Sequence, residues 1–220
     1  MKFSKIAAGL AALTIGTASM ADLVLTEGFD NVGALAGAGW VQVNRSTNPG
    51  NPFFQGNPGV FTSAAGAADS YVAANFLSGV GTISNWLITP VLTFESRILV
   101  DFMVRAAGGG FVDGIEVRLS TNGASTDVGV GPLTEGDFST LLGSYVSDTD
   151  DGWVAQQLVY EGLAAGTQGR LAFRYRVADT NVDGNYIGID SLSVTVPEPA
   201  SLALAGLALS GMLYSRRRRA

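Results

Sequence analysis

Apolar and polar residues alternate with a period of two along several short stretches of the 220-residue chain. In residues 98–105 the apolar side chains take every second position, with Asp101 and Arg105 among those between them. This spacing puts apolar side chains on one face of a half-buried strand, whereas a helical pattern would repeat every ~3.6 residues. The same alternation occurs in residues 115–120, 171–177 and 191–196. Further strand candidates are residues 23–26, 70–76, 86–88, 139–146 and 154–160.

Turn-forming residues separate these stretches. The chain has 29 glycines, which is about twice the usual share of about 7%. Clusters of Gly, Asn, Asp and Pro, such as residues 48–52 and 56–59, stand between the strands. Roughly ten short strands with polar turns predict an all-β fold, an antiparallel two-sheet sandwich of the jelly-roll kind. Because no change in composition divides residues 22–196, we expect one β-jelly-roll domain there.

The chain contains 0 Cys and 0 His. This excludes disulfide bonds, thiol nucleophiles, Ser-His-Asp or Cys-His pairs, and zinc sites of the usual kind. Carboxylates are therefore the abundant reactive groups. Residues 22–196 hold 7 basic and 18 acidic residues, a net charge of −11. A domain of this charge repels nucleic acid and attracts divalent cations, so we expect no nucleic-acid partner.

Residues 1–21 have the parts of a secretory signal peptide. Lys2 and Lys5 supply positive charge, and residues 6–17 are uncharged and mostly apolar. Ser19 and Ala21 then place small side chains before a cleavage site. We expect a signal helix that is removed after Ala21. A core helix at the N-terminus is the alternative, but strand-like sequence begins immediately at Asp22.

Residues 197–220 form a second segment of three parts. The first part has Pro197 and Pro199, with one residue between them, and these prolines end any strand. The second part, residues 201–214, is apolar and uncharged. Fourteen helical residues span about 21 Å, short of a hydrocarbon core of about 30 Å. The four arginines that follow would stay cytoplasmic and leave the domain outside. The segment predicts a weak anchor with a transmembrane-like helix; a nucleic-acid-binding tail is the alternative interpretation of the arginines.

This C-terminal segment resembles a PEP-CTERM sorting signal. The resemblance rests on Val196-Pro197-Glu198-Pro199-Ala200, the apolar stretch and the arginine cluster. It implies transient anchoring in the inner membrane and processing by an exosortase-type enzyme. It also implies delivery to the cell surface or exopolysaccharide matrix of a Gram-negative bacterium. The expected sorting residues are Pro197, Glu198, Pro199, Arg216, Arg217, Arg218 and Arg219.

The domain resembles the choice-of-anchor J family, which is similar to the cleaved-adhesin domains of secreted bacterial proteins. The matching segments are Glu27–Asp30, Gly39–Trp40, Asn75–Phe76 and, most sharply, Ser84–Leu92. The resemblance covers most of residues 23–196 and implies a β-jelly roll at the cell surface. Trp86 and Ile88 would share one face of a strand, so we interpret residues 84–92 as scaffold and not as a site.

Residues 179–190 are a candidate calcium site. Asp179, Asn181 and Asp183 can point oxygen ligands into one loop, and Asp190 falls at the twelfth position. Because no helices flank the segment, an EF-hand is excluded and a β-loop site is the version that fits. A turn capped by its own side chains is the alternative.

The family resemblance implies a second calcium arrangement. The similar adhesin domains include calcium-bound members in which acids near the first strand meet acids near the last strand. In this chain Glu27 or Asp30 would approach Asp190 if the terminal strands are neighbours. We expect Ca²⁺, at one or the other of these two groups, as the single cofactor.

Phe53, Phe54 and Trp153 are candidates for glycan contact. Phe53 and Phe54 lie in the polar segment 51–57, and Trp153 follows an acidic turn. Sugar rings stack on aromatic faces flanked by hydrogen-bonding side chains. Core packing is the alternative, and it is the default use of aromatic residues.

Arg170, Arg174 and Arg176 would form an exposed stripe on one strand. Such a stripe could bind an acidic glycan. The alternative is pairing with acids of a neighbouring strand, such as Glu116.

Two export-type ends around an acidic β domain without His or Cys predict a non-enzymatic protein. We expect a carbohydrate-binding or structural, adhesive module, with extracellular polysaccharide as its partner. The alternative is a carboxylate-dependent glycan hydrolase, which needs two carboxyl groups roughly 5–9.5 Å apart across a cleft. Acids are abundant in the chain, but its sequence marks out no such pair.

Overall fold

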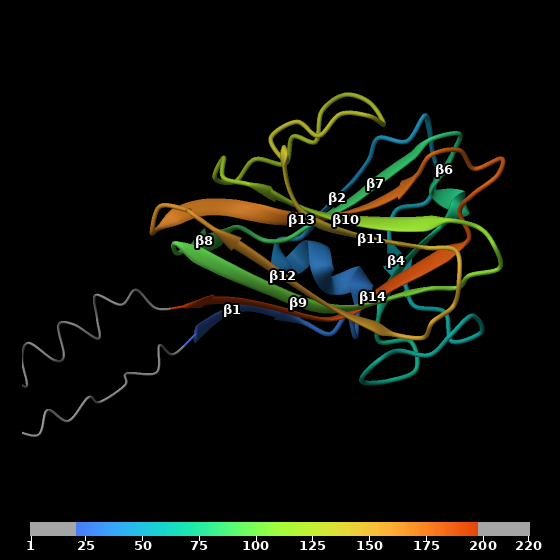
Figure 1. Ribbon diagram of the computed structural model, residues 1–220, viewed down its shortest axis with the longest axis horizontal. Coiled ribbons are helices and arrows are strands. Elements are labelled where there is room, and N and C mark those ends of the chain that lie inside the picture. The colour runs from blue at the N-terminus through green and yellow to red at the C-terminus, as the bar shows by residue number, and fades with distance from the viewer. Residues whose placement is uncertain (1–20, 198–220) are drawn as a thin grey trace, which may run out of the picture. The chain divides into compact units, whose positions relative to one another are not determined.

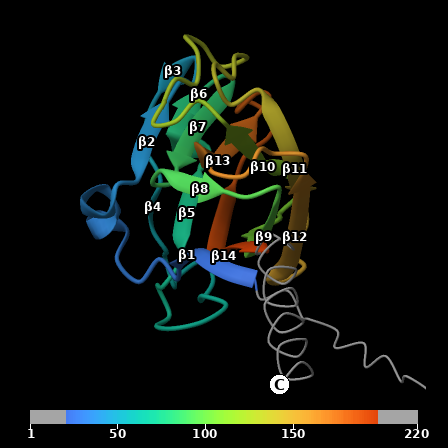
Figure 2. The same cartoon turned by 90° about the vertical axis from the view of Figure 1, so that its left-hand side faces the viewer.

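The computed structural model describes residues 21–197, and Ala21–Pro197 forms one compact unit. Its strands form two six-stranded antiparallel sheets that lie face to face (Figures 1 and 2). The predicted all-β, two-sheet antiparallel sandwich is therefore confirmed. The predicted signal helix in residues 1–20 and the predicted helix in residues 198–220 lie outside the described residues.

The first sheet, called here the β14 sheet, is built around the last strand. Its order is β12 (Val154–Glu161), β9 (Arg97–Ala106), β14 (Tyr186–Pro197), β5 (Val72–Asn75) and β4 (Phe54–Gln55), with β1 (Ala21–Glu27) also paired with β14.

The second sheet, called here the β13 sheet, faces it across the core. Its order is β11 (Thr140–Ser147), β10 (Asp113–Ser120), β13 (Thr167–Val177), β7 (Ile83–Ile88) and β2 (Val41–Asn44), with β8 (Leu92–Phe94) also paired with β13. The remaining elements are the two-stranded pair of β3 (Asn48–Pro49) and β6 (Gly79–Val80) and the 3₁₀ helices η1 (Val32–Ala38) and η2 (Phe76–Ser78).

The core forms between the inner faces of the two sheets. Along β9 every second residue is buried, as the alternation in residues 98–105 predicts. Phe102 on β9 meets Phe173 on β13 edge-to-face, with ring centroids 5.3 Å apart. Burying a side chain of this size stabilises the fold by about 1.5–3 kcal/mol. The contact joins the two sheets through their apolar faces.

The outer face of the β13 sheet is also covered. Trp86, Ile88 and Ala172 point away from the main core and form a second buried cluster with Val128 and Phe138. The last two residues come from the long loop 121–139, which lies over this face. Trp86 and Ile88 therefore share one face of β7, as the sequence predicts, and β7 is buried on both faces.

The two terminal strands are neighbours. One edge of β14 pairs first with β5, through Tyr186–Ile189, and then with β1, from Leu192 onward. Between these two partners β14 shifts its register against β9, and Ser191 has a φ of 53°. Positive φ is uncommon for a residue other than glycine. Asp190 is the last residue paired with β9 before this irregularity, and it lies opposite Met103.

Candidate ligand-binding site

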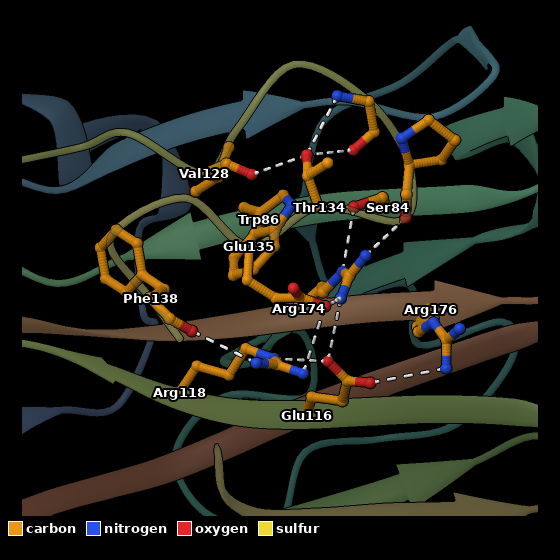
Figure 3. Close-up of polar contacts among 12 residues, drawn as sticks. Ser84, Trp86, Glu116, Arg118, Val128, Thr134, Glu135, Phe138, Arg174 and Arg176 are labelled. Carbon is orange, nitrogen blue, oxygen red and sulfur yellow. Dashed lines mark hydrogen bonds and ion pairs between the residues drawn. The ribbon is translucent and has the colours of Figure 1, made fainter. Parts of the chain in front are cut away.

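A line of paired residues crosses the β13 sheet. Glu116 on β10 lies opposite Arg174 on β13, and Arg174 lies opposite Trp86 on β7. Side chains directly opposite one another share a face of the sheet and stand about 4.5–5.5 Å apart. This register gathers a carboxylate, a guanidinium and an indole on the outer face (Figure 3).

Arg174 lies at the centre of this line, and its side chain is only 1% exposed. Its Nη1 lies 3.2 Å from Glu116 Oε2 and 3.3 Å from Glu135 Oε1, and its Nε donates to Ser84 Oγ at 3.0 Å. Burial lowers the pKa of Arg174, and the charge of Glu116 opposes that shift. The guanidinium stays charged, because arginine does not deprotonate in proteins.

Glu116 contacts three arginines. Its Oε2 accepts from Arg118 Nε at 2.7 Å, and its Oε1 lies 3.7 Å from Arg176 Nη1. Burial alone would raise the pKa of Glu116. The hydrogen bond from Arg118 and the charges of Arg174, Arg118 and Arg176 outweigh burial and hold that pKa below its ordinary value. Glu116 is therefore ionised at neutral pH.

The loop 121–139 closes over this network. Glu135 belongs to the loop, and Arg118 Nη1 donates to the backbone oxygen of Phe138 at 3.2 Å. The Phe138 ring lies 6.0 Å from the Trp86 ring, centroid to centroid. Ion pairs and aromatic packing therefore hold the loop on the sheet (Figure 3).

The predicted exposed arginine stripe is wrong for Arg174, because the loop 121–139 buries it. The alternative, pairing with Glu116, is confirmed for Arg174 and Arg176. Arg170 turns its Nη1 toward the backbone oxygens of Gly39 and Thr89, at 3.1 and 2.6 Å. Arg176 remains accessible, with its side chain 45% exposed.

A cavity of about 260 Å³ opens beside Arg176, between β10, β11, β13 and the loop 178–185. We call it the Arg176 cavity. Its walls are partly apolar, with Val112, Val146 and Val177 among them. Its polar lining includes Glu116, Ser144, Arg176 and Asp183.

The Arg176 cavity combines donors and acceptors. Within residues 21–197 the Arg176 side chain makes no hydrogen bond that competes for its five N–H groups; its nearest partner is Glu116 at 3.7 Å. Glu116 and Asp183 offer carboxylate oxygens on the same lining. Each hydroxyl of a polyol can donate to a carboxylate and accept from a guanidinium. The cavity therefore suits a small hydroxyl-rich ring with an apolar face.

Glu116 and Glu135 form a pair of carboxylates, since both contact Nη1 of Arg174. Glycoside hydrolysis needs one carboxyl group with a raised pKa, which stays protonated and acts as the acid. The pKa of Glu116 is lowered instead. Glu116 therefore fits the role of an ion-pair partner better than that of the catalytic acid.

Asp190 lies at the bulge between the β5 and β1 sections of β14, and it is fully buried. Its Oδ2 accepts from the amides of Ala64 and Ala65 at 2.8 and 3.0 Å, and its Oδ1 accepts from the Ser191 amide. Burial raises the pKa of Asp190, and these amide donors oppose the shift. The carboxylate ties the loop 63–70 to the last strand.

Glu27 and Asp30 lie near this junction. Glu27 is at the end of β1, and its Oε1 accepts from the Phe29 amide at 2.8 Å. Asp30 is exposed, and its Oδ1 lies only 3.2 Å from the position that a Cβ on Gly66 would take. Asp30 and Asp190 therefore border the same loop. The terminal strands β1 and β14 are neighbours, and calcium binding at their junction stays a prediction.

The candidate calcium loop is held by its own side chains. Asp179 Oδ1 accepts from the amide of Asn181 at 3.0 Å and from its Nδ2 at 2.7 Å. Asp183 Oδ1 accepts from the Val112 amide at 3.1 Å. This is the locally capped turn that was the alternative interpretation. Asp179 lies in the loop before β14, which begins at Tyr186, and Asp190 lies about 13 Å further along that strand. The Asp190 carboxylate binds the loop 63–70 and does not join Asp179.

No group of three or more acidic side chains within residues 21–197 lies close enough to hold a metal ion. Calcium takes six to eight oxygen ligands. An ion at the β1–β14 junction would therefore need backbone carbonyls or water in addition to carboxylates.

The three aromatic candidates lie in two different places. Phe53 is 2% exposed and belongs to the main core, so it presents no ring face to a ligand. Phe54 and Trp153 are partly buried and border one aromatic cluster on the outer face of the β14 sheet. Trp153 Nε1 donates to the backbone oxygen of Thr62 at 2.8 Å. Trp153 therefore holds the loop 57–70 as well as offering an edge to solvent.

Of the predicted sorting residues, Pro197 ends β14. Glu198, Pro199, Arg216, Arg217, Arg218 and Arg219 lie outside the described residues. Within residues 21–197 no helix has the length and apolar character needed to span a membrane.

Val112, Ser144 and Val146 line the Arg176 cavity, and no sequence pattern marks them as site residues. Ser144 lies opposite Glu116 because β11 pairs with β10. Strand alternation shows which side chains share a face, but not which strands are neighbours. No local signal could have assembled these residues.

Known proteins match the chain in one short sequence motif and in the fold of the domain. Residues 195–219 match the PEP-CTERM protein-sorting motif, which marks an exported and surface-sorted protein. No curated protein matches the chain in sequence.

Solved structures of cleaved adhesin domains share the fold, three of them from one protein. The K1 cleaved adhesin domain of Lys-gingipain from Porphyromonas gingivalis W83 is 22% identical, with a TM-score of 0.59 over 80% of this chain and 99% of that domain. The K3 domain of the same protein is 18% identical, with a TM-score of 0.53 over 80% and 99%. The K2 domain is 18% identical, with a TM-score of 0.54 over 77% and 98%. The chain thus joins a domain with the fold of the cleaved adhesins to a PEP-CTERM protein-sorting motif.

Proposed function

We propose that this protein is an exported surface module that binds polysaccharide and does not cleave it. The observation that carries the proposal is the Arg176 cavity, where a guanidinium with free donors, two carboxylates and apolar walls line about 260 Å³. This combination suits the hydroxyl groups and apolar face of a sugar ring.

The sorting motif supports the proposed location. An exosortase-type enzyme processes the tail near Pro197, after a transient stage in the inner membrane of a Gram-negative bacterium. The domain then stays at the cell surface or in the exopolysaccharide matrix. The adhesin name of the similar structures agrees with a binding role at a surface.

Calcium is a proposed structural partner at the β1–β14 junction. Within the described residues no hydrogen bond engages the Asp30 carboxylate, and Asp30 borders the loop that binds Asp190. Carboxylate and carbonyl oxygens are the ligands that Ca²⁺ prefers. The ion would fix the loop 63–70 against the terminal strands.

Isothermal titration of residues 22–196 with neutral oligosaccharides tests the proposed function. This segment can be produced alone, because the core lies within Ala21–Pro197. Arg176→Ala should weaken binding about tenfold or more, since it removes the free donors of the cavity. Val146→Trp should also weaken it, because Val146 is exposed on the cavity wall and a larger side chain would fill the space.

Two variants serve as controls for this titration. Arg97 is a similarly exposed arginine, at 49%, on the other sheet, and Arg97→Ala should leave binding unchanged. Val159 is an exposed valine on β12, and Val159→Trp controls for the added indole. Equal binding by Arg176→Ala, Val146→Trp and the wild type would contradict the proposed site.

A further inference from the structure

A second cavity, of about 460 Å³, lies on the other side of the loop 178–185. We call it the Leu77 cavity. It is lined by residues of β3, η2 and β6 and by Thr180 and Asn181 of the loop. Ala178 and Asp183 of the same loop line the Arg176 cavity. One loop therefore forms a wall of both cavities.

Hydrogen bonds on both sides hold this loop in place. Thr180 and Gly81 exchange two of them: the Thr180 amide donates to Gly81 O at 3.0 Å, and the Gly81 amide donates to Thr180 Oγ1 at 2.9 Å. On the other side the backbone oxygen of Val112 accepts from the Gly184 amide at 3.0 Å, and the Val112 amide donates to Asp183 Oδ1 at 3.1 Å. The wall between the cavities is therefore fixed before a ligand arrives, which lowers the entropy cost of binding.

The Leu77 cavity has no charged side chain in its lining. Phe76, Leu77 and Val80 are exposed there, although they are large and apolar. The amide side chains of Asn48 and Asn181 lie beside them. Apolar surface with amide hydrogen-bonding groups fits the C–H face and the hydroxyls of an uncharged sugar ring.

The charge of the domain selects among polysaccharides. Residues 22–196 carry a net charge of −11, which repels an acidic polymer. In the Arg176 cavity the single accessible guanidinium is balanced by Glu116 and Asp183. Neither cavity therefore offers the unbalanced positive charge that a chain of uronic acids needs.

Both cavities lie toward one end of the sandwich. β14 starts at Tyr186, directly after the loop 178–185, and runs to Pro197 at the other end (Figure 1). Eleven steps of about 3.3 Å place Tyr186 about 36 Å from Pro197, the last described residue. A long polymer can therefore cross the loop without meeting the C-terminal end of the domain.

We propose that one neutral polysaccharide chain crosses the loop 178–185 and occupies both cavities at once. The Arg176 cavity holds one sugar unit through its charged groups, and the Leu77 cavity holds a unit further along the chain through apolar contact. This inference rests on the proposed function, because it assigns a second subsite to the same ligand.

The test is the dependence of affinity on oligosaccharide length. Residues 22–196 are titrated with xylo-, cello- and manno-oligosaccharides from disaccharide to hexasaccharide, and with oligogalacturonates of the same lengths. Affinity for a neutral series should rise about tenfold or more with length, since the longer chain gains the second subsite. Leu77→Ala should remove that rise and leave the disaccharide affinity unchanged. Leu133→Ala is the control, because Leu133 is also exposed, at 68%, and does not line the Leu77 cavity.

The outcomes separate the two proposals. Equal affinity at every length, with Arg176→Ala still weakening binding, overturns the second subsite and leaves the proposed function intact. Tighter binding of oligogalacturonates than of every neutral series overturns the neutral class of ligand. If the folded wild type binds no oligosaccharide of any series, the proposed function fails, and the second subsite fails with it.

Discussion

The guanidinium carbon of Arg174 lies 4.8 Å from the centre of the Trp86 ring, and both side chains are buried on the outer face of a β-sheet. The buried positive charge of Arg174 is stabilised by ion pairs with Glu116 and Glu135 and by the cation–π contact with the Trp86 indole. The pair fixes the loop 121–139 on the sheet.

Replacing Arg174 tests this role. Arg174→Met should destabilise the domain by about 2 kcal/mol or more, because it removes the hydrogen bonds and ion pairs that Arg174 makes with Ser84, Glu116 and Glu135. Urea unfolding followed by tryptophan fluorescence measures the change. Arg97→Met on the opposite sheet is the control and should change stability by less than about 1 kcal/mol, since it lies in an exposed ion pair. Equal stability of the two variants would contradict the role of Arg174.

Glu116 should make the domain sensitive to acid. Its folded pKa lies below the ordinary value of 4.5, so its contribution to stability is fully present above that pH and is lost as the pH falls through the folded pKa. The stability difference between the wild type and Glu116→Gln should be large at pH 7 and shrink below about pH 4.5. Glu161→Gln, in an exposed pair with Arg97, should show a small difference throughout. A Glu116→Gln difference that grows toward acid would refute this assignment.

Gly188 packs against the aromatic cluster of the β14 sheet. A Cβ there would lie 2.9 Å from Tyr71, 3.0 Å from Phe61 and 3.0 Å from Trp153. Gly188→Ala should therefore cost about 1–3 kcal/mol of stability, as overpacking usually does. Gly37→Ala is the control, because nothing lies within 4 Å of its Cβ position. Thermal melting compares the two variants. If Gly188→Ala leaves the melting temperature unchanged, the aromatic rings can move apart freely and the predicted overpacking is wrong.

Calcium should raise the melting temperature of the domain if it binds at the β1–β14 junction. A ligand at about 100 times its Kd stabilises a protein by about 2.7 kcal/mol. Asp30→Asn should abolish the calcium effect, while Asp179→Asn should leave it in place. Loss of the effect in Asp179→Asn alone would move the ion to the loop 178–185. If calcium neither raises the melting temperature of the wild type nor gives a heat of binding, the domain does not bind calcium.

Processing at both ends should be visible in the mass of the mature protein. We expect cleavage after Ala21 and removal of the tail near Pro197, because the PEP-CTERM motif occupies residues 195–219. Intact-mass analysis of the protein from the surface fraction measures both ends. A full-length mass, from Met1 to Ala220, in the cytosolic fraction would contradict export.

The strands could be predicted well because their signal is local. Every segment predicted as a strand contains one, and the alternation in residues 98–105 gives the buried face of β9 correctly. The sequence does not predict the short strands β2, β4 and β8, since a whole strand of two to four residues carries little periodicity. Their positions depend on pairing with longer strands.

The candidate site could be predicted only in part. The sequence indicates the pairing of Arg174 with Glu116 as one of two alternatives, because alternating residues on neighbouring strands can meet. The sequence does not predict the burial of Arg174, since that burial depends on the loop 121–139 folding back over the sheet. The Arg176 cavity likewise needs β11 beside β10, a neighbour relation that no local pattern encodes.

The most direct test of binding without cleavage uses the purified domain and neutral polysaccharides in one experiment. Residues 22–196 are incubated with insoluble xylan, cellulose and mannan, and both the bound protein and the new reducing ends are measured. The domain should be retained on at least one polymer, Arg176→Ala should be released, and no reducing ends should form. New reducing ends that vanish when one Asp or Glu is changed, or failure of the folded domain to bind any of the polymers, would contradict it.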